Sequence, residues 1–266
     1  MDIRDLAITS LETITVFDIE TGDYLFTLDE LQNATINQGQ EKVDITGKQG
    51  RKITSLKRNK TVTVSGTNGL VSTGLLGLQV GSKFENGSYE VLWTDEIKAT
   101  EAGKAETSYV AIGDAGAEII DLYIKKEDGT LGELLTQSPD TADGSSFTYD
   151  PASKALVFDE TKVPAGTELT VYYKRMIAEA MQLENLSDKY SGKAKIYIDA
   201  MAEDKCANVY HIQYCIPKGD FSGEFEMGMG DDQTVHAFEV EALAGGCGDS
   251  NGFFTLTIIG KDAEDA

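Results

Sequence analysis

Short runs of alternating apolar and polar residues recur along most of this chain, separated by glycine, proline, asparagine and aspartate. A period of two is typical of β-strands that bury one face. Residues 13–18 and 24–28 flank turn residues at 21–23 and predict a β-hairpin. Further strands are expected at residues 33–37, 61–65, 119–125, 147–149, 155–158, 168–173, 193–199, 210–216, 222–229, 234–242 and 253–259. The pattern therefore predicts a mainly β protein.

Residues 178–183 are compatible with a strand or a helix, and we assign them to a strand because their neighbours are strands. The pair Asn86-Gly87, within residues 84–93, is the strongest hairpin-turn signal in the chain. Trp93, the sole tryptophan, is expected to anchor a core there. Residues 217–219 and 230–232 are predicted to be turns.

One helix is predicted, at residues 68–79, directly after the strand at 61–65. Ser65, Thr67 and Asn68 are alternative N-caps. Glycines at 69, 74 and 77 weaken this helix, so it requires packing on a sheet. Its apolar face is predicted to consist of Leu70, Val71, Leu75 and Leu78.

The composition becomes small and polar near residues 100–105, which suggests a domain boundary. We expect residues 1–100 and 176–266 to form one β-sandwich domain. Residues 101–175 are expected to be an inserted, acidic, β-rich unit with its own strands and turns.

A basic cluster interrupts a strongly acidic chain of 266 residues with a formal net charge of -22. It is predicted to be a glycine-containing loop that stays mobile until a partner orders it. The partner nearest to hand is the acidic surface of another copy, although an ordinary solvated loop is the alternative. The cluster consists of Lys48, Arg51, Lys52, Lys57, Arg58 and Lys60.

Enzymatic chemistry finds little support in the sequence. Residues 47–52 (GKQGRK) lack the spacing of a phosphate-binding loop, and Ser222 misses the nucleophile-elbow pattern by one position. Three cysteines without a CxxC pair, and a lone His211 in a strand-like run, argue against a disulfide framework or a zinc site. We therefore predict no catalytic residues, no metal and no cofactor.

The chain also lacks a signal-peptide core and any apolar run of the roughly 18 residues that span a bilayer, so we expect a soluble protein without a membrane partner. Strong acidity likewise argues against tight, sequence-independent binding of nucleic acid.

Residues 42–82 (KVDITGKQGRKITSLKRNKTVTVSGTNGLVSTGLLGLQVGS) resemble the amino-terminal region of major tail tube proteins of tailed bacteriophages, especially long-tailed phages of Gram-positive hosts. Residues 210–243 are similar to the closing strands of the same proteins. The resemblance implies a β-sandwich or barrel with one flanking helix, six copies in a ring, and rings stacked helically into a tube. It also implies a virion protein made in the host cytoplasm.

The resemblance further implies partners. These are other copies of the chain, other tail proteins such as the tape measure, terminator and distal tail proteins, and genomic DNA that passes through a negative lumen without specific binding. Two other classes stay open: a different virion or surface component, such as a capsid decoration protein or adhesin, and a carbohydrate-active enzyme. An adhesin or decoration protein has no need of a self-associating basic loop, whereas an enzyme needs a concave site with convergent carboxylates.

Overall fold

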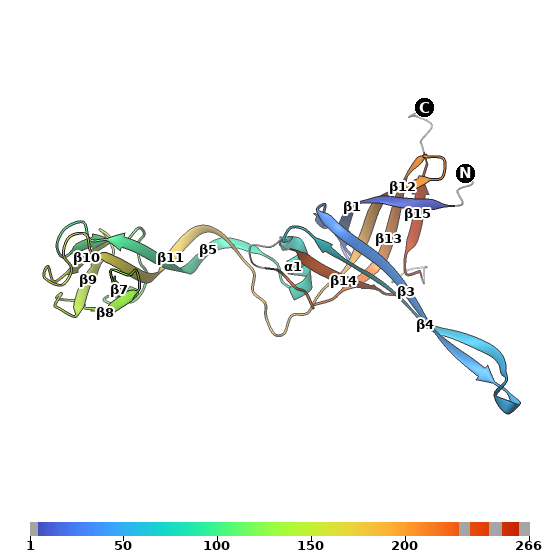
Figure 1. Ribbon diagram of the computed structural model, residues 1–266, viewed down its shortest axis with the longest axis horizontal. Helices are drawn as coiled ribbons and strands as arrows, with labels where there is room; N and C mark the ends of the chain where they lie inside the picture. The colour runs from blue at the N-terminus through green and yellow to red at the C-terminus, as the bar shows by residue number, and fades with distance from the viewer. Residues whose placement is uncertain (1–4, 229–234, 245–251, 261–266) are drawn as a thin grey trace. The chain divides into compact units, whose positions relative to one another are not determined.

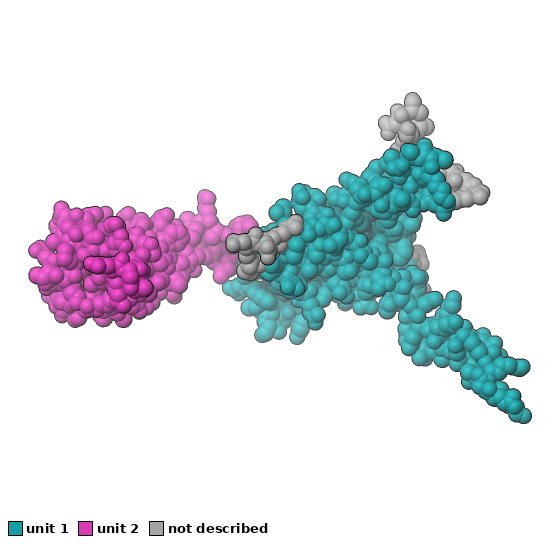
Figure 2. All heavy atoms as spheres, in the orientation of Figure 1, with its two compact units in different colours: residues 1–84, 183–266 teal, residues 85–182 magenta. Residues whose placement is uncertain are grey.

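In a computed structural model, which describes residues 5–228, 235–244 and 252–260, the chain is mainly β and divides into two compact units. Unit 1 contains residues 1–84 and 183–266, and unit 2 contains residues 85–182 (Figure 2). Unit 2 begins earlier and ends later than the predicted insertion of residues 101–175. The reason is that β5 (Glu85–Lys98) and β11 (Glu168–Gln182) pair along nearly their whole length, from Lys98 with Glu168 to Glu85 with Gln182.

Unit 1 is built on one antiparallel sheet that curls into a half-barrel (Figure 1). The strand order is β2-β1-β12-β13-β14-β4-β3, and β15 pairs with β13 beside that path. The strands are β1 (Leu6–Asp18), β2 (Tyr24–Leu28), β3 (Leu31–Thr46), β4 (Lys52–Asn68), β12 (Lys193–Asp204), β13 (Val209–Phe221), β14 (His236–Ala242) and β15 (Thr255–Ile259). The predicted first hairpin is β1 and β2, with Val16 opposite Phe26.

Alternation along the strands divides the sheet of unit 1 into a core face and a polar face. On β12, for example, Ala194, Ile196 and Ile198 are buried, while the residues between them are partly exposed. The buried residues of the core are Ile14, Val16, Phe26, Leu28, Val62, Val64, Leu75, Ala194, Ile196, Ile198, Ile216, Phe221, Phe238, Val240 and Ala242. Because nearly all of them come from strands, the hydrophobic effect holds the half-barrel together through one face of each strand.

The helix of unit 1 is shorter than predicted: α1 spans Thr73–Val80. Residue 68 cannot start it, because Asn68 belongs to β4 and pairs with both His236 and Leu31. Ser72 is the N-cap instead, and its hydroxyl accepts a hydrogen bond from the Leu75 amide at 3.3 Å.

The predicted apolar face of the helix is correct only in part. Leu75 is buried in the core of unit 1, and Leu78 packs against it partly buried. Leu70 and Val71 precede the helix and are exposed, because the chain leaves β4 there to reach the N-cap. The prediction that they lie on the helix was wrong.

One turn prediction in the carboxy-terminal part was also wrong, and the other, at residues 230–232, lies outside the described residues. Residues 217–219 lie inside β13, where the register shifts between Ile216 and Gly219 opposite β12. Pro217 has no N–H to donate to a neighbouring strand. It is tolerated there because the β-bulge at this point needs no such hydrogen bond. Residues 222–228 contain no strand and only an isolated bridge from Met227 to His236, while Met229 and Thr234 lie outside the described residues. The last strand, β15, is mostly exposed rather than buried, because it pairs with β13 alone.

Unit 2 is a second antiparallel-rich β structure with a core of its own. Besides β5 and β11 it contains β6 (Lys104–Glu106), β7 (Ile119–Lys125), β8 (Leu131–Gln137), β9 (Ser146–Asp150) and β10 (Ala155–Phe158). Their order is β5-β11-β7-β8-β9-β10-β6, and the β8–β9 pair is parallel. Asn86-Gly87 forms no turn, because both residues lie within β5 opposite Met181 and Ala180 of β11.

A buried carboxylate organises the hydrogen bonds of unit 2. Asp95 accepts from the Tyr173 hydroxyl at 2.7 Å, the Ser108 amide at 2.7 Å and the Trp93 indole at 3.1 Å. Burial alone would raise the pKa of Asp95, but the hydrogen bonds from Tyr173 and Ser108 outweigh it and lower the pKa below its ordinary value. Trp93 therefore anchors this part of unit 2 through its N–H as well as its ring.

Candidate functional site

The basic cluster lies on a long β-ribbon that stands clear of the sheet of unit 1, where the distal parts of β3 and β4 run together (Figure 1). On its other side β4 pairs with β14 only from Thr63 to Asn68. Residues 41–60, called the hairpin arm below, therefore have no third strand beside them within the described residues, and none of these residues is buried. Figure 2 shows the same segment as a narrow extension of unit 1.

The hairpin arm has a defined fold, contrary to the predicted mobile loop. Its end is a single 3-10 turn, η1 (Lys48–Gly50), closed by a hydrogen bond of 2.7 Å from the Gly47 amide to the Arg51 carbonyl. Gln49 at φ 64° and Gly50 at φ 72° both take the left-handed conformation in this tight reversal, which glycine adopts without steric cost. Strand pairing continues from the sheet to this turn, since Thr46 is opposite Lys52.

The six predicted cations all lie on the hairpin arm, but they differ in surroundings. Lys52 pairs with Asp44 at 2.6 Å, and the Nε of Arg58 pairs with Glu41 at 2.9 Å. Lys60 lies 5.7 Å from the centre of the Phe253 ring. Among the described residues, Lys48, Arg51 and Lys57 form no ion pair, so these three cations are free to meet a partner.

A bulge braces the base of the arm. Between the pairs Gly39–Thr61 and Glu41–Arg58 the register shifts, and Asn59 takes a positive φ of 50°. The Glu41 carboxylate accepts from Arg58 and also from the Asn59 amide group at 2.6 Å. Asparagine adopts such a conformation at little cost, and bulges increase the twist of a ribbon.

The hairpin arm also carries apolar side chains, which the predicted basic cluster did not include. Ile53 is 65% exposed, Leu56 56% and Ile45 40%, and Val43 is partly exposed opposite Leu56. Val43, Ile45 and Leu56 lie on one face of the ribbon by this register, and Ile53 lies at the register shift beside Ile45; we call these four residues the apolar stripe. The signal was visible in the sequence as isoleucine and leucine between the cations, but it acquires meaning only once the strands are known to lack a covering layer.

The polar face of the unit 1 sheet is the second candidate surface. Residues that pair across antiparallel strands point to the same side, so registers define rows across it. One row contains Thr13, Asp199, Gln213 and Thr257. Another runs through Asp220, Glu241, Thr63 and Asn37. Hydroxyl, amide and carboxylate groups therefore form these two rows, while Phe17, Tyr197 and Met201 are apolar residues on the same face.

Charges on the polar face include both signs. Four carboxylates, those of Asp199, Asp220, Glu239 and Glu241, share it with the two lysines at 193 and 195. Asp199 accepts from the Gln213 amide at 2.9 Å and lies 3.0 Å from the His211 Nε2 atom, which places His211 in a polar network rather than a metal site.

An apolar groove lies beside α1, with a volume of about 480 Å³. Its floor is glycine-rich, and Gly74 is required there because a Cβ would lie 2.6 Å from the Cβ of Phe26. Tyr190, 81% exposed, and Tyr24, 61% exposed, stand at its rim. Its residues are Tyr24, Leu25, Phe26, Thr73, Gly74, Gly77, Leu78, Gly81, Ser82, Lys83, Phe84, Tyr190 and Gly192.

A buried histidine fixes the helix that borders the groove. The Nδ1 of His236 on β14 accepts from the Ser72 amide at 3.3 Å, and its Nε2 lies 2.8 Å from the Gln79 carbonyl oxygen. The Gln79 amide group donates to the Ala237 carbonyl at 3.0 Å, so the Gln79 oxygen accepts from the imidazole N–H. Burial lowers the pKa of His236, which favours the neutral form.

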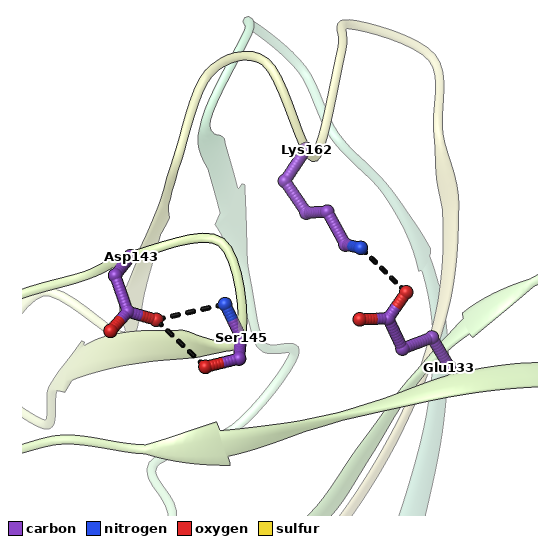
Figure 3. Close-up of polar contacts among 4 residues, drawn as sticks. All are labelled: Glu133, Asp143, Ser145 and Lys162. Atoms are coloured by element: carbon purple, nitrogen blue, oxygen red, sulfur yellow. Dashed lines mark hydrogen bonds and ion pairs between the residues drawn. The ribbon is translucent and has the colours of Figure 1, made fainter.

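The polar clusters of unit 2 are explained by local structure. In Figure 3, Asp143 accepts from the amide and hydroxyl of Ser145 at 2.8 and 3.0 Å, and Lys162 pairs with Glu133 at 2.5 Å. The Ser145 amide hydrogen bond is the main reason that the pKa of Asp143 is lowered. Asp143 therefore closes a turn, and the ion pair joins two exposed segments.

Metal-ligating residues do not converge in the part of the chain that the structure describes, where no group of three His, Cys, Asp or Glu could hold an ion. Cys206 and Cys215 are free thiols, and Cys247 lies outside the described residues. None of the described helices has the length and apolar character needed to cross a bilayer.

Comparison with known proteins gives one finding on identity. No curated protein matches the chain. A family model described as the YomU/Tube protein family matches residues 6–255. The description names tube proteins, which points to a phage protein with a structural role in a virion. Because the matched residues cover nearly all of its 266 residues, this chain belongs to the YomU/Tube protein family.

Proposed function

We propose that this chain is the subunit of a phage tail tube: six copies close into a ring, and rings stack helically around a channel that delivers the genome into the host. The hairpin arm is the observation that carries the proposal. It is an ordered ribbon whose residues are nowhere buried within their own chain, on a member of a tube family. Such a ribbon is marginally stable alone, so a neighbouring copy is the expected support.

The length of the arm suits contact between rings. A strand advances about 3.3 Å per residue, so the ten residues from Lys52 to Thr61 extend the ribbon by roughly 30 Å past the last pairing of β4 with β14. An arm of this length reaches beyond the subunit that bears it.

Open sheet edges supply the contacts within a ring. The path across the unit 1 sheet ends at β2 and at β3, and β2 covers β1 only from Ile14 to Phe17. Unpaired strand edges invite pairing with another chain, and closing a ring of half-barrels removes them.

The polar face of the sheet lines the channel in this proposal. Apolar residues occupy the other face, so the polar face is the one able to contact water and passing DNA. Its carboxylates outnumber its two lysines, and each phosphate contact avoided removes a source of salt-dependent adhesion. DNA passes through without specific binding.

Contacts with other tail proteins complete the proposed assembly. Tube ends are to be capped by terminator and distal tail proteins, and the channel is to be occupied by a tape measure protein before DNA passes. Unit 2 is a separate compact unit, inserted in the chain between residues 84 and 183.

Electron microscopy of the purified protein tests this proposal. Negative staining is expected to show rings and stacked tubes, whereas dispersed monomers or trimers would favour a decoration protein or an adhesin. In a triple variant, Lys48→Ser, Arg51→Ser and Lys57→Ser, we expect tubes to be lost while the fold is kept. A single exposed pair contributes only about 0–1 kcal/mol, so the effect depends on repetition around each ring.

A matched triple variant controls for net charge. Lys98→Ser, Lys104→Ser and Lys126→Ser remove three exposed cations of unit 2, outside the arm, and should leave tubes intact. Tubes of normal length from the arm variant would show that these cations do not hold rings together.

A further inference from the structure

The apolar stripe is exposed to water and would be stabilised by a second apolar surface that covers it. Ile45, Ile53, Leu56 and Val43 lie on a ribbon over which the described part of the chain places no third strand and no helix. The arm's own ion pairs, Lys52 with Asp44 and Arg58 with Glu41, already use two of the six cations of the basic cluster internally. Since exposed ion pairs are weak, burial of the stripe is the larger source of binding free energy, at roughly 25 cal/mol per Å² of apolar surface.

The groove beside α1 offers a surface of matching character. Leu25, Phe26, Leu78 and Phe84 line it, and the exposed rings of Tyr24 and Tyr190 border it. Within the described residues no side chain of this chain fills it. Tyrosine at a rim is typical of interface residues, because the ring is apolar and the hydroxyl hydrogen-bonds to a partner.

Carboxylates near the groove complement the cations of the arm, although Lys83 lines the groove and exposed Lys189 precedes Tyr190. Glu20 and Asp23 lie in the exposed turn that leads into Tyr24, and Asp188 is exposed two residues before Tyr190. Asp18 in the same turn is held by the amides of Glu20 and Thr21 at 2.8 and 2.9 Å. The Glu20 and Asp23 carboxylates form no ion pair among the described residues and can meet Lys48 or Arg51.

We infer that the groove beside α1 receives the apolar stripe of the hairpin arm from a second copy of this chain. The stripe fills the groove between Tyr24 and Tyr190, and the cations of the arm end face the carboxylates of the β1–β2 turn. This inference rests on the proposed function and assigns the place at which one copy holds the arm of the next. Hydrophobic burial provides the affinity, and charge provides the orientation.

Disulfide trapping between two differently marked chains tests the inference. In a background with the three native cysteines replaced by serine, one chain carries Ile53→Cys or Leu56→Cys. The other carries Tyr24→Cys or Tyr190→Cys together with a tag that changes its mass. Mild oxidation of the mixed assembly is expected to give an arm-to-groove heterodimer in at least one of the four pairings, since a disulfide requires Cβ atoms about 3.5–4.5 Å apart.

Ile8→Cys is the matched control for the groove, because Ile8 is an exposed residue of β1 in the same unit and lies outside the groove. Equal trapping of the arm by Ile8→Cys overturns the inference. So does an intramolecular disulfide in a dilute chain that carries both Leu56→Cys and Tyr190→Cys. Tubes that form without any arm-to-groove disulfide also overturn it but leave the proposed function standing, whereas a chain that never assembles overturns both.

Discussion

His236 shows how one side chain joins separate parts of unit 1. Its two nitrogens reach Ser72 before α1 and Gln79 near the helix end, while the residue itself belongs to β14. A protonated imidazole has no acceptor for the Ser72 amide, so protonation costs both a hydrogen bond and the burial of a charge. The helix that borders the groove is therefore sensitive to acid.

We predict that unit 1 loses stability as the pH falls below about 6.5, the ordinary pKa of histidine. The pKa of His236 is lowered in the folded state, so the unfolded state binds the proton more readily. The contribution is complete above the unfolded pKa and is lost as the pH falls through the folded one. Urea unfolding at several pH values measures it.

A variant with His236→Gln should be less stable at neutral pH by roughly 1–2 kcal/mol, and its urea midpoint should change less between pH 6.5 and 5. The chain has only one other histidine, so His211→Gln is the natural control and should keep that pH dependence. A pH dependence unchanged in the His236 variant would contradict this account.

At the scale of elements, the hairpin arm differs from the remaining parts of β3 and β4. β3 and β4 are single strands from the sheet to the arm end, yet among the described residues only the proximal part of β4 has strands on both sides and buried residues. The sequence identified residues 61–65 as a strand but interpreted the basic stretch before them as a loop. Lysine-rich, fully exposed strands lack the alternation that reveals half-buried ones, so the pairing decided the structure there.

We predict that amides of Lys52–Thr61 exchange hydrogen about tenfold faster or more than those of Thr63–Asn68 in the unassembled protein. A ribbon of two exposed strands opens locally at lower free energy than a strand within a sheet. Hydrogen exchange followed by mass spectrometry resolves the two halves of β4. Assembly should protect the arm selectively, with the centre of β12 as an internal reference; an arm as slow to exchange as β12 before assembly would contradict the prediction.

At the scale of the whole molecule, the two units have separate cores. The buried cluster of unit 1 and that of unit 2 share no residue. β5 and β11, the strands that begin and end unit 2, pair with each other, so the strand pairing of each unit lies within that unit. Segments that share one hydrophobic core unfold together, and here the two units have separate cores.

We therefore predict two unfolding transitions in differential scanning calorimetry. Ile196→Ala should lower the transition temperature of unit 1 alone, and Leu122→Ala that of unit 2 alone. Each should reduce the free energy of unfolding of its unit by about 2–5 kcal/mol, because both side chains are almost fully buried. Asp95→Ala, which leaves the buried Tyr173 hydroxyl and Trp93 indole without their acceptor, should affect the same transition as Leu122→Ala. A single transition lowered by every variant would mean that the units unfold together.

By itself, the sequence determined what depends on local pattern and total charge. Period-two alternation specified most strands, such as residues 13–18 and 193–199, and the acidic net charge made the basic stretch conspicuous. Only the tertiary structure decided what depends on partners distant in the chain. Asn86-Gly87 lies in a strand because β11 pairs with it, Asn68 ends β4 because β14 and β3 flank it, and the apolar stripe is exposed because no strand lies beside it. Strand pairing is non-local, so a turn signal or a hydrophobic residue acquires its role from the neighbour that the fold provides.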